Sequence, residues 1–336
     1  MTTACILGCS GTQLTAEERV FFEKVQPFGF ILFARNVETP GQVRALVDEM
    51  RSIVGRPNAP VLIDQEGGRV QRLKPPNWPD FPPAAKFGEL YGQDRGRATD
   101  AVRLGARLIA AELAAVGVNV DCLPVADVRQ PEGHDVIGDR SYGADPAVVA
   151  SLAQAAADGL MEEGVLPVVK HIPGHGRARV DSHEKLPVVD ASVEELERVD
   201  FEPFRRLASL PIAMTAHVVY SRLDPERAAT VSPKVIKDVI RGRIGFRGLL
   251  LTDDLSMKAL RGGLGERAEA AIGAGCDIAL HCNGKMEEMV EVAAASPKLT
   301  GEAAKRAEAA LGRLKRPAKP LLVAEARTRF SAMITA

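Results

Sequence analysis

The chain has 336 residues, of which 46% are hydrophobic and only 4% are aromatic. A single α/β barrel commonly reaches this length, and the apolar content suffices for a large core of alanine, valine, leucine and isoleucine. With 43 lysine and arginine residues against 44 aspartate and glutamate residues, the formal net charge is −1. This balance gives no indication of a nucleic-acid partner or of binding to a membrane surface.

The first residues, MTTACILGCS, contain one short apolar run with no basic segment before it. A secretory signal needs a positively charged start and a longer apolar region, of roughly 7–15 residues. No stretch approaches the roughly 20 apolar residues of a transmembrane helix. We therefore expect a cytoplasmic protein. Its five cysteines form no CxxC pair, so we expect reduced core residues rather than disulfides or a zinc site.

Eight short apolar runs are typical of buried parallel strands. In chain order they are Cys5–Cys9, Gly29–Phe33, Val61–Asp64, Val118–Leu123, Leu166–His171, Ile212–His217, Gly248–Asp253 and Asp277–His281. Helical patterns alternate with them, at Thr39–Val54, Ala98–Val116, Asp145–Glu163, Ser192–Leu207, Ser232–Arg241, Glu266–Gly273, Met286–Ala295 and Gly301–Leu314. This alternation predicts a single (β/α)₈ TIM barrel over residues 1–336. A doubly wound open sheet is the competing fold, but no GxGxxG motif follows the first run.

Two segments interrupt this alternation. Lys74–Asp94 is rich in proline and holds Trp78, the single tryptophan, whereas His171–Pro187 is polar with helix-breaking glycine and proline residues. Both follow strands, which places them at the C-terminal mouth of a barrel, where active sites lie. The glycines of residues 171–187 favour a mobile lid. In the C-terminal tail, residues 317–336, no clear element is predicted, and we expect it to wrap the barrel or to be partly mobile.

Charged and imidazole side chains gather at the ends of the predicted strands. They are Asp64, Asp127, Lys170, His171, His217 and Asp253. Charges at the ends of apolar strands cost desolvation energy unless they are paired or used. The set therefore favours a site that holds a polar ligand through many hydrogen bonds. The alternative reading is a collection of helix caps and internal ion pairs, such as one between Asp64 and Arg72.

Several segments resemble the bacterial β-N-acetylglucosaminidases of glycoside hydrolase family 3. In chain order they are ILFARNVETPGQV, IDQEGGRVQRL, VIGDRSYG, KHIPGHGRARVDSHEKLP and LTDDLSM, which together span most of the chain. The long loop from KHIPGHG to DSH is the most specific of them. The resemblance implies a barrel without the second domain of larger members, and a retaining enzyme that removes terminal N-acetylglucosamine.

The resemblance also implies the catalytic residues. Asp253 of LTDDLSM matches the family nucleophile, although its neighbour Asp254 is a structural rival because either carboxylate is able to cap the next helix. Asp181 and His183 of the DSH segment match the acid/base pair. An imidazole, with a reference pKa of about 6.5, is suited to protonate a leaving oxygen and then deprotonate water. A neighbouring carboxylate orients such a ring.

The resemblance assigns substrate contacts to Asp64, Arg72, Arg140, Lys170 and His171. Carboxylates and guanidinium groups are able to bind two neighbouring sugar hydroxyls at once. Arg69, His175, Asp127 and His217 are further candidates for supporting these residues. Trp78 is a candidate stacking platform for a second sugar, although a lone tryptophan more often packs in a core. The resemblance implies no cofactor. A metal site is not expected either, since Pro173 and Gly174 disrupt helical ligand spacing between His171 and His175.

The substrate implied by the resemblance is a small saccharide or muropeptide, and with a cytoplasmic location it implies a role in peptidoglycan recycling. The linkage would be N-acetylglucosamine β-1,4 to an anhydro-muramic residue. We expect a monomer, with no nucleic-acid and no membrane partner. Three alternatives remain at this point: a phosphorylase of the same fold, a non-catalytic barrel that binds a sugar or muropeptide, and a metal-dependent barrel hydrolase.

Overall fold

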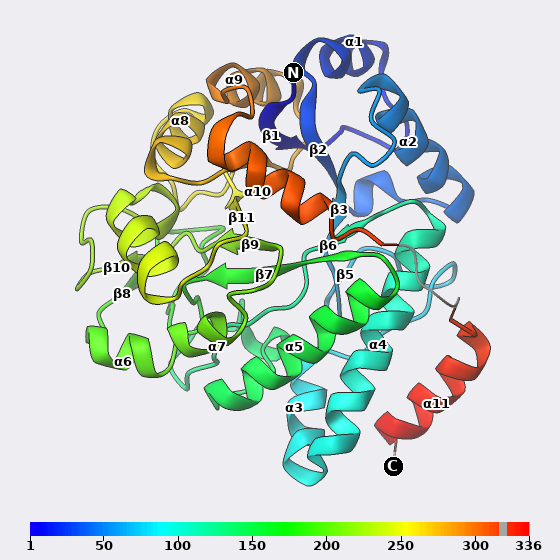
Figure 1. The fold of residues 1–336 in the computed structure, drawn as a ribbon, viewed down its shortest axis with the longest axis vertical. Coiled ribbons are helices and arrows are strands. Elements are labelled where there is room, and N and C mark those ends of the chain that lie inside the picture. Colours follow the sequence, from blue (N-terminus) through cyan, green and yellow to red (C-terminus); the bar gives the residue numbers. More distant parts are fainter. Residues whose placement is uncertain (316–320, 336) are drawn as a thin grey trace.

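Eight parallel strands close into a barrel surrounded by helices (Figure 1), as the sequence predicts. The computed structural model describes residues 1–315 and 321–335. The barrel order follows the chain: β1 (Thr3–Leu7), β2 (Pro27–Leu32), β3 (Val61–Ile63), β6 (Val120–Asp121), β7 (Leu166–Ile172), β9 (Ile212–Thr215), β11 (Leu249–Asp254) and β12 (Ile278–His281). Two small sheets join β4 (Gln65–Gly67) to β5 (Val70–Gln71) and β8 (Val188–Val189) to β10 (Val219–Tyr220). Each predicted apolar run contains most or all of one barrel strand.

Side chains alternate between two cores along each barrel strand. In β1, Ala4 and Ile6 belong to the cluster inside the barrel, whereas Cys5 and Leu7 belong to the larger cluster between the strands and the helices. Successive side chains of a strand point to opposite faces, so a strand inside this fold is buried on both sides. This double burial explains why the strands appear in the sequence as continuous apolar runs. All five cysteines are buried and unpaired with one another.

The barrel is covered by helices whose first residues are capped as the sequence suggests. Thr39, Asp145 and Ser192 each accept a hydrogen bond from the first turn of the helix that follows. The helices are α1 (Ala16–Val25), η1 (Ala34–Asn36), α2 (Pro40–Ile53), α3 (Ala84–Gln93), α4 (Arg95–Ala115), η2 (Gly138–Arg140), α5 (Pro146–Glu162), α6 (Val193–Arg198), α7 (Phe201–Arg206), η3 (Ala229–Val231), η4 (Val235–Arg243), α8 (Leu264–Ala274), α9 (Met286–Ala295), α10 (Gly301–Leu311) and α11 (Val323–Thr335).

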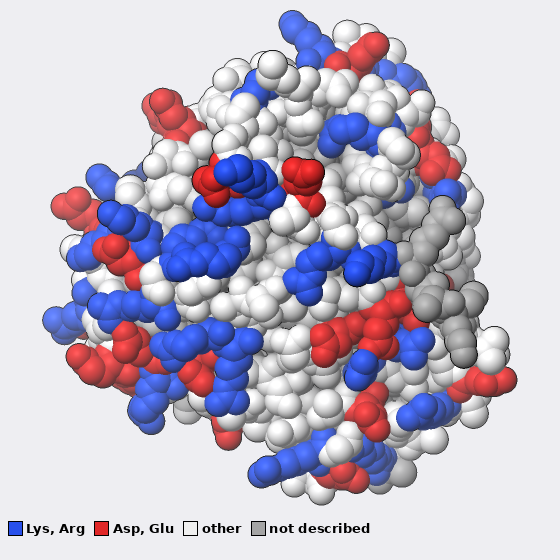
Figure 2. Space-filling model, in the orientation of Figure 1, with Lys and Arg blue, Asp and Glu red and all other residues white. Residues whose placement is uncertain are grey.

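Helix α10 lies across the N-terminal end of the barrel (Figure 1). Its residues Ala307 and Ala310 belong to the apolar cluster inside the barrel, so this end is closed by packing. On this face, lysine and arginine side chains are interspersed with acidic ones, in keeping with the near-neutral charge (Figure 2). No helix in residues 1–315 and 321–335 is long and apolar enough to cross a bilayer.

The prediction of a tail without a clear element was wrong for its second half. Residues Val323–Thr335 form helix α11, which packs beside α4, where the guanidinium of Arg97 donates to the carbonyl of Met333 at 2.7 Å. Its buried residues, Ala326 and Phe330, together with the partly buried Val323, Met333 and Ile334, recur at helical spacing, so the sequence carried a helical signal that the prediction did not use. The predicted segment also includes residues 317–320 and 336, which lie outside the described residues.

Three further elements differ from the prediction. The Lys74–Asp94 segment is not irregular throughout, because its second half forms α3. The expected helix at Ser192–Leu207 is divided into α6 and α7 around Val199 and Asp200. Pro203 explains the division: in a continuous helix its missing N–H would leave the carbonyl of Val199 without a partner, and its ring would clash there. Helix α1, which has a capping box from Thr15 to Glu18, was not predicted.

Candidate active site

A cavity of about 290 Å³ opens at the C-terminal ends of the barrel strands, opposite α10. Pockets for drug-sized ligands span roughly 300–1,000 Å³, so this cavity suits a small ligand such as one sugar unit. All eight residues predicted for catalysis or substrate binding line it: Asp64, Arg72, Arg140, Lys170, His171, Asp181, His183 and Asp253. The fold therefore brings together residues that are up to 189 positions apart in the sequence, from Asp64 to Asp253.

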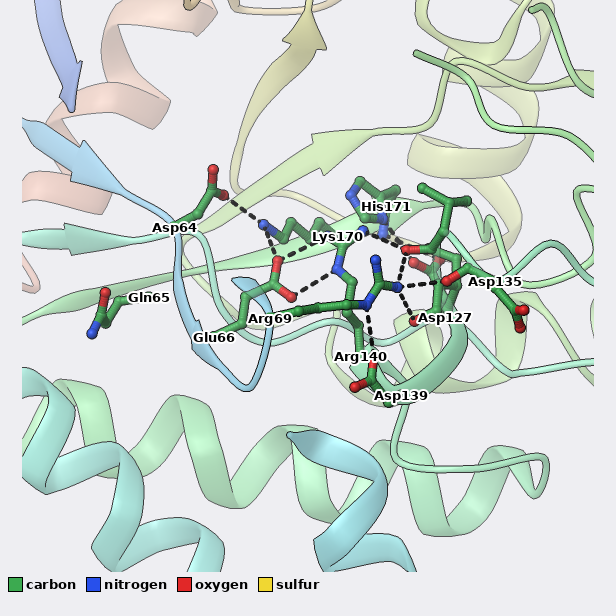
Figure 3. Close-up of polar contacts among 12 residues, drawn as sticks. Asp64, Gln65, Glu66, Arg69, Asp127, Asp135, Asp139, Arg140, Lys170 and His171 are labelled. Atoms are coloured by element: carbon green, nitrogen blue, oxygen red, sulfur yellow. Dashed lines mark hydrogen bonds and ion pairs between the residues drawn. The ribbon is translucent and has the colours of Figure 1, made fainter. Parts of the chain in front are cut away.

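A chain of alternating charges forms one wall of the cavity (Figure 3). The ammonium group of Lys170, at the end of β7, lies 2.8 Å from Asp64 Oδ1 and 2.7 Å from Glu66 Oε1. The guanidinium of Arg140 donates to both oxygens of Glu66, each at 2.8 Å. An ammonium has three protons, so two carboxylate partners leave Lys170 one donor for a ligand.

The charges in this wall hold one another in the ionised state. Burial raises the pKa of Asp64, but the adjacent charges of Lys170 and Arg72 outweigh it and hold that pKa well below its usual range. Burial lowers the pKa of Lys170, but Asp64 and Glu66 outweigh it and raise that pKa above its usual range. Buried charges without partners would be very costly. The wall is therefore a fixed pattern in which charged hydrogen-bond donors and acceptors alternate.

Arg72 and Arg69 extend the wall toward the mouth. Arg72 donates to Asp64 Oδ2 at 3.0 Å, so the ion pair considered from the sequence is present, and its guanidinium lies 5.1 Å from the ring centroid of Phe33. Arg69 pairs with Asp139 at 2.8 Å and donates to the carbonyl of Val136 at 2.8 Å. Arg69 therefore fixes the loop that carries Arg140, and it also lines the cavity.

Asp127 is fully buried behind His171 and determines how that ring is placed. Its Oδ2 lies 2.7 Å from His171 Nδ1, and its Oδ1 accepts from the backbone N–H of His171 at 3.3 Å (Figure 3). Burial raises the pKa of Asp127, but the neighbouring His171 and His175 outweigh it and lower that pKa. With Nδ1 held by this carboxylate, Nε2 is the nitrogen of His171 that remains for a ligand.

Asp253 and Asp254 end β11, and their hydrogen bonds separate them clearly. Asp254 is committed to the local backbone: it accepts from the N–H groups of Ser256 at 3.0 Å and Cys282 at 3.2 Å, and from the Ser256 hydroxyl at 2.6 Å. Asp253 accepts only from the backbone N–H of Asp254, at 2.8 Å, among the described residues. Asp253 is therefore the carboxylate with oxygens free toward the cavity.

The charge state of Asp253 follows from its surroundings. Burial raises its pKa, but the nearby His171 and His217 outweigh it and lower that pKa, so the carboxylate is ionised at neutral pH. Nε2 of His217 lies 3.0 Å from the carbonyl oxygen of Asp254, and its Nδ1 lies 2.7 Å from Thr230 Oγ1. His217 thus supports the strand end and does not line the cavity.

Asp181 and His183 reach the cavity from the loop after β7. Asp181 Oδ1 accepts from the backbone N–H of His183 at 2.9 Å and lies 2.7 Å from its ring Nδ1. Burial raises the pKa of Asp181, but these hydrogen bonds outweigh it and lower that pKa. The ring of His183 is exposed, in contrast to the buried His171 and His175. Its Nε2 is therefore available to a ligand.

Sequence reasoning missed two residues of the site. Glu66 pairs with Arg140 and Lys170, and no local pattern in the sequence indicates either pairing. Ser182, between Asp181 and His183, lines the cavity and lies 3.1 Å from His175 Nε2. Trp78, the stacking candidate, is packed in the core and does not line the cavity. Trp78 and Phe81 of the Pro-rich segment belong to the core between the strands and the helices.

The arrangement places one free carboxylate and one exposed imidazole on the same small cavity, beside a wall of fixed charges. A carboxylate is a competent nucleophile, and an imidazole with a carboxylate partner is a competent general acid and base.

Comparison with known proteins agrees with this geometry. Residues 7–316 match the family model "Glycosyl hydrolase family 3 N terminal domain". A beta-hexosaminidase from Tolumonas auensis is 40% identical over 285 residues, covering 83% of each chain. One from Thioalkalivibrio sulfidiphilus is 41% identical over 282 residues, covering 83% of this chain and 80% of its own.

Solved structures show the same similarity across the whole fold. NagZ from Neisseria gonorrhoeae, in complex with N-trifluoroacetyl-D-glucosamine, is 30% identical with a TM-score of 0.83, over 99% of this chain and 98% of that one. A family 3 beta-N-acetylglucosaminidase from Paenibacillus is also 30% identical, with a TM-score of 0.82 over 99% of this chain. The present chain spans 62% of that longer protein.

Proposed function

The chain belongs to glycosyl hydrolase family 3 and is a β-hexosaminidase, and we propose that it removes N-acetylglucosamine from the non-reducing end of its substrate with retention of configuration. The observation that carries this proposal is the free Asp253 carboxylate on the cavity that also receives the Asp181–His183 pair. The chain acts as a single catalytic barrel domain and as a monomer. The N-acetylglucosamine specificity is supported by the acylated glucosamine bound to the Neisseria protein.

In the first step Asp253 attacks the anomeric carbon, and His183 Nε2 protonates the departing glycosidic oxygen. A covalent glycosyl-enzyme forms as the bond to the leaving group breaks. In the second step His183 takes a proton from water, which attacks the same carbon and releases Asp253. Asp181 holds Nδ1 of His183 throughout and stabilises the imidazolium, as a carboxylate does in a catalytic triad.

Five residues hold the sugar during both steps: Asp64, Arg72, Arg140, Lys170 and His171. Lys170 retains one donor and the oxygens of Asp64 retain lone pairs, so both are able to bond hydroxyls without giving up their own ion pair. Because the wall is ordered before the sugar arrives, little conformational entropy is lost on binding. The loop at about residues 171–187 acts as a mobile lid that brings His183 to the bound sugar.

The substrate that fits this reading is N-acetylglucosamine β-1,4-linked to an anhydro-muramic residue, with or without a peptide. The role is peptidoglycan recycling, in the cytoplasm. The support is the resemblance of the loop and strand-end motifs to the bacterial enzymes of this family, together with a cavity sized for one sugar. No cofactor takes part in the proposed steps.

Trapping the intermediate tests the nucleophile directly. A fluorinated, slowly released N-acetylglucosaminyl donor is incubated with the protein, which is then digested and mapped by mass spectrometry. We expect one label, on the peptide that carries Asp253. A label elsewhere, or inversion at the anomeric carbon by NMR, contradicts the proposal. Phosphorolysis is resolved in the same experiment, because added phosphate would then yield sugar 1-phosphate instead of the free sugar.

A further inference from the structure

Asp127 makes a second set of contacts that sugar binding does not require. Besides holding His171, its Oδ1 accepts from the backbone N–H of His175 at 2.6 Å. The rings of His171 and His175 then lie edge to face, with centroids 5.7 Å apart. One buried carboxylate thus fixes both the ring of His171, which follows Lys170 of the charged wall, and the start of the loop that carries Asp181 and His183.

The ring of His175 in turn contacts the segment that carries Asp181 and His183. Its Nε2 lies 3.1 Å from the hydroxyl of Ser182, and both side chains are buried. Ser182 is the residue between Asp181 and His183. Its carbonyl also accepts from the backbone N–H of Ala259 at 3.2 Å, in the loop after β11. The middle of the acid/base segment is therefore held at two points, while the His183 ring itself stays exposed.

The direction of the His175–Ser182 hydrogen bond follows from the rest of the ring. Burial first, and then the charge of His171, lower the pKa of His175 to about 4, so the ring is neutral at pH 7. Its Nδ1 is buried and has no partner among the described residues. A proton on Nδ1 would be a buried donor without an acceptor, which is the costlier arrangement. The proton therefore lies on Nε2, and Ser182 Oγ accepts it.

We propose that His175 is a positioning residue, which through Ser182 fixes the Asp181–His183 pair relative to the Asp127–His171 pair. The inference rests on the proposed function of that pair. The connection runs from Asp127 to the backbone of His175, through its ring to Ser182, and so to the residues on either side. When the connection is intact, the loop position that presents His183 to the sugar is stabilised. When it is lost, the sugar wall remains but proton transfer is impaired.

Leaving-group dependence separates this role from a purely structural one. Protonation by His183 matters greatly for a poor leaving group and little for an activated one such as dinitrophenolate. The constant kcat/KM reports the step that breaks the glycosidic bond. For Ser182→Ala we expect kcat/KM to fall about 10²-fold with a poor leaving group and less than about threefold with an activated one. Ser182→Thr keeps the hydroxyl and retains most of the activity.

Variants of His175 provide the matched set. In His175→Gln the side-chain amide lies about as far from the backbone as Nε2, whereas in His175→Asn it lies about as far as Nδ1. Nδ1 has no partner in the part of the chain that the structure describes. We expect His175→Gln to retain most of the activity on poor leaving groups, and His175→Asn and His175→Leu to behave as Ser182→Ala. The affinity for N-acetylglucosamine, measured by calorimetry, stays within about threefold of wild type in all of them, because the wall is unchanged.

Two outcomes overturn the proposal. One is an equal loss of kcat/KM with poor and activated leaving groups, which indicates general structural damage. The other is a Ser182→Ala protein that retains wild-type activity on poor leaving groups. Hydrogen exchange of residues 177–186 gives a readout that needs no turnover: we expect faster exchange in His175→Leu and Ser182→Ala than in His175→Gln. Failure of the proposed function is recognised separately, because the wild type would then release neither leaving group.

Discussion

The carboxylate of Asp181 accepts two hydrogen bonds from His183, one from its backbone N–H at 2.9 Å and one from its ring Nδ1 at 2.7 Å. A single oxygen thus fixes both the backbone and the ring of the residue that follows two positions later. Because Nδ1 is occupied, the ring presents Nε2 to the cavity. This geometry determines which nitrogen exchanges protons with the substrate in the proposed mechanism.

Replacing Asp181 with alanine should therefore damage catalysis more than binding. We expect kcat/KM on a poor leaving group to fall about 10²-fold or more, since general acid–base catalysis contributes roughly 10²–10⁴-fold. Steady-state kinetics with aryl glycosides of graded leaving-group pKa measures it. Glu184→Gln, at an exposed carboxylate on the same loop, is the control and should leave the rate unchanged. Equal losses in the two variants contradict the role of Asp181.

The two aspartates that end β11 should give opposite results. Asp253→Asn removes the free carboxylate, and we expect kcat to fall by roughly 10³-fold or more with unfolding free energy little changed. Asp254→Asn weakens the bonds to Ser256 and Cys282, and we expect a loss of about 1–3 kcal/mol in stability with a much smaller loss of kcat. Urea unfolding and single-turnover kinetics on both proteins separate the two effects. A reversed pattern would make Asp254 the nucleophile.

The strands of the barrel were predictable because each is buried on both faces and appears as an uninterrupted apolar run. The residues at the strand ends were predictable because a charged side chain next to an apolar run is costly to bury unless it is paired or used. Which residues pair with which was not predictable. Glu66 meets Arg140, 74 positions later, and nothing local to either residue specifies the other. Such pairings depend on the closed barrel.

The C-terminal helix and the catalytic loop were predicted less well, because their contacts also depend on the closed barrel. Helix α11 was missed although Val323, Ala326, Phe330 and Met333 recur at helical spacing, and the surface of α4 that this stripe packs against is not specified by local sequence. The Ser182–His175 contact joins a hydroxyl and an imidazole across a loop whose shape depends on packing against Val128 and Ala259. The sequence identified the loop by its motif, but the loop's internal support became visible only in the fold.

Lys170 should be essential for stability as well as for binding. Its side chain is 3% exposed and its ammonium balances both Asp64 and Glu66, so Lys170→Met leaves two buried carboxylates without that partner. Removing one partner of a buried ion pair costs about 3–5 kcal/mol. Chemical denaturation at pH 7 measures the loss. The exposed Arg19–Glu49 pair provides the control, since Arg19→Met should cost about 1 kcal/mol or less.

The buried, neutral His175 should make the fold sensitive to acid. Burial lowers its pKa from 6.5 to about 4, so between these values the unfolded chain binds a proton at this residue and the folded chain does not. Stability from this group is complete above about pH 6.5 and is lost as pH falls toward 4. Between pH 7 and pH 5 we expect a loss of about 2 kcal/mol that His175→Gln does not show. Urea unfolding at both pH values measures it, and identical slopes in the two proteins contradict the buried neutral ring.

Gly176 should tolerate no side chain, because a Cβ there would lie 1.9 Å from the carbonyl oxygen of Val128. Backbone on both sides of the contact prevents a cheap adjustment, so the catalytic loop must move away from the segment that follows β6. We expect Gly176→Ala to lower kcat/KM by about 10²-fold, because small displacements of positioned groups have effects of this size. Gly92→Ala, in α3 with open space around the new Cβ, is the matched control. It should leave the rate unchanged and raise stability by up to about 1 kcal/mol, which thermal unfolding and steady-state kinetics on both variants measure. Unchanged activity in Gly176→Ala would show that the loop does not need its close approach to Val128 for catalysis.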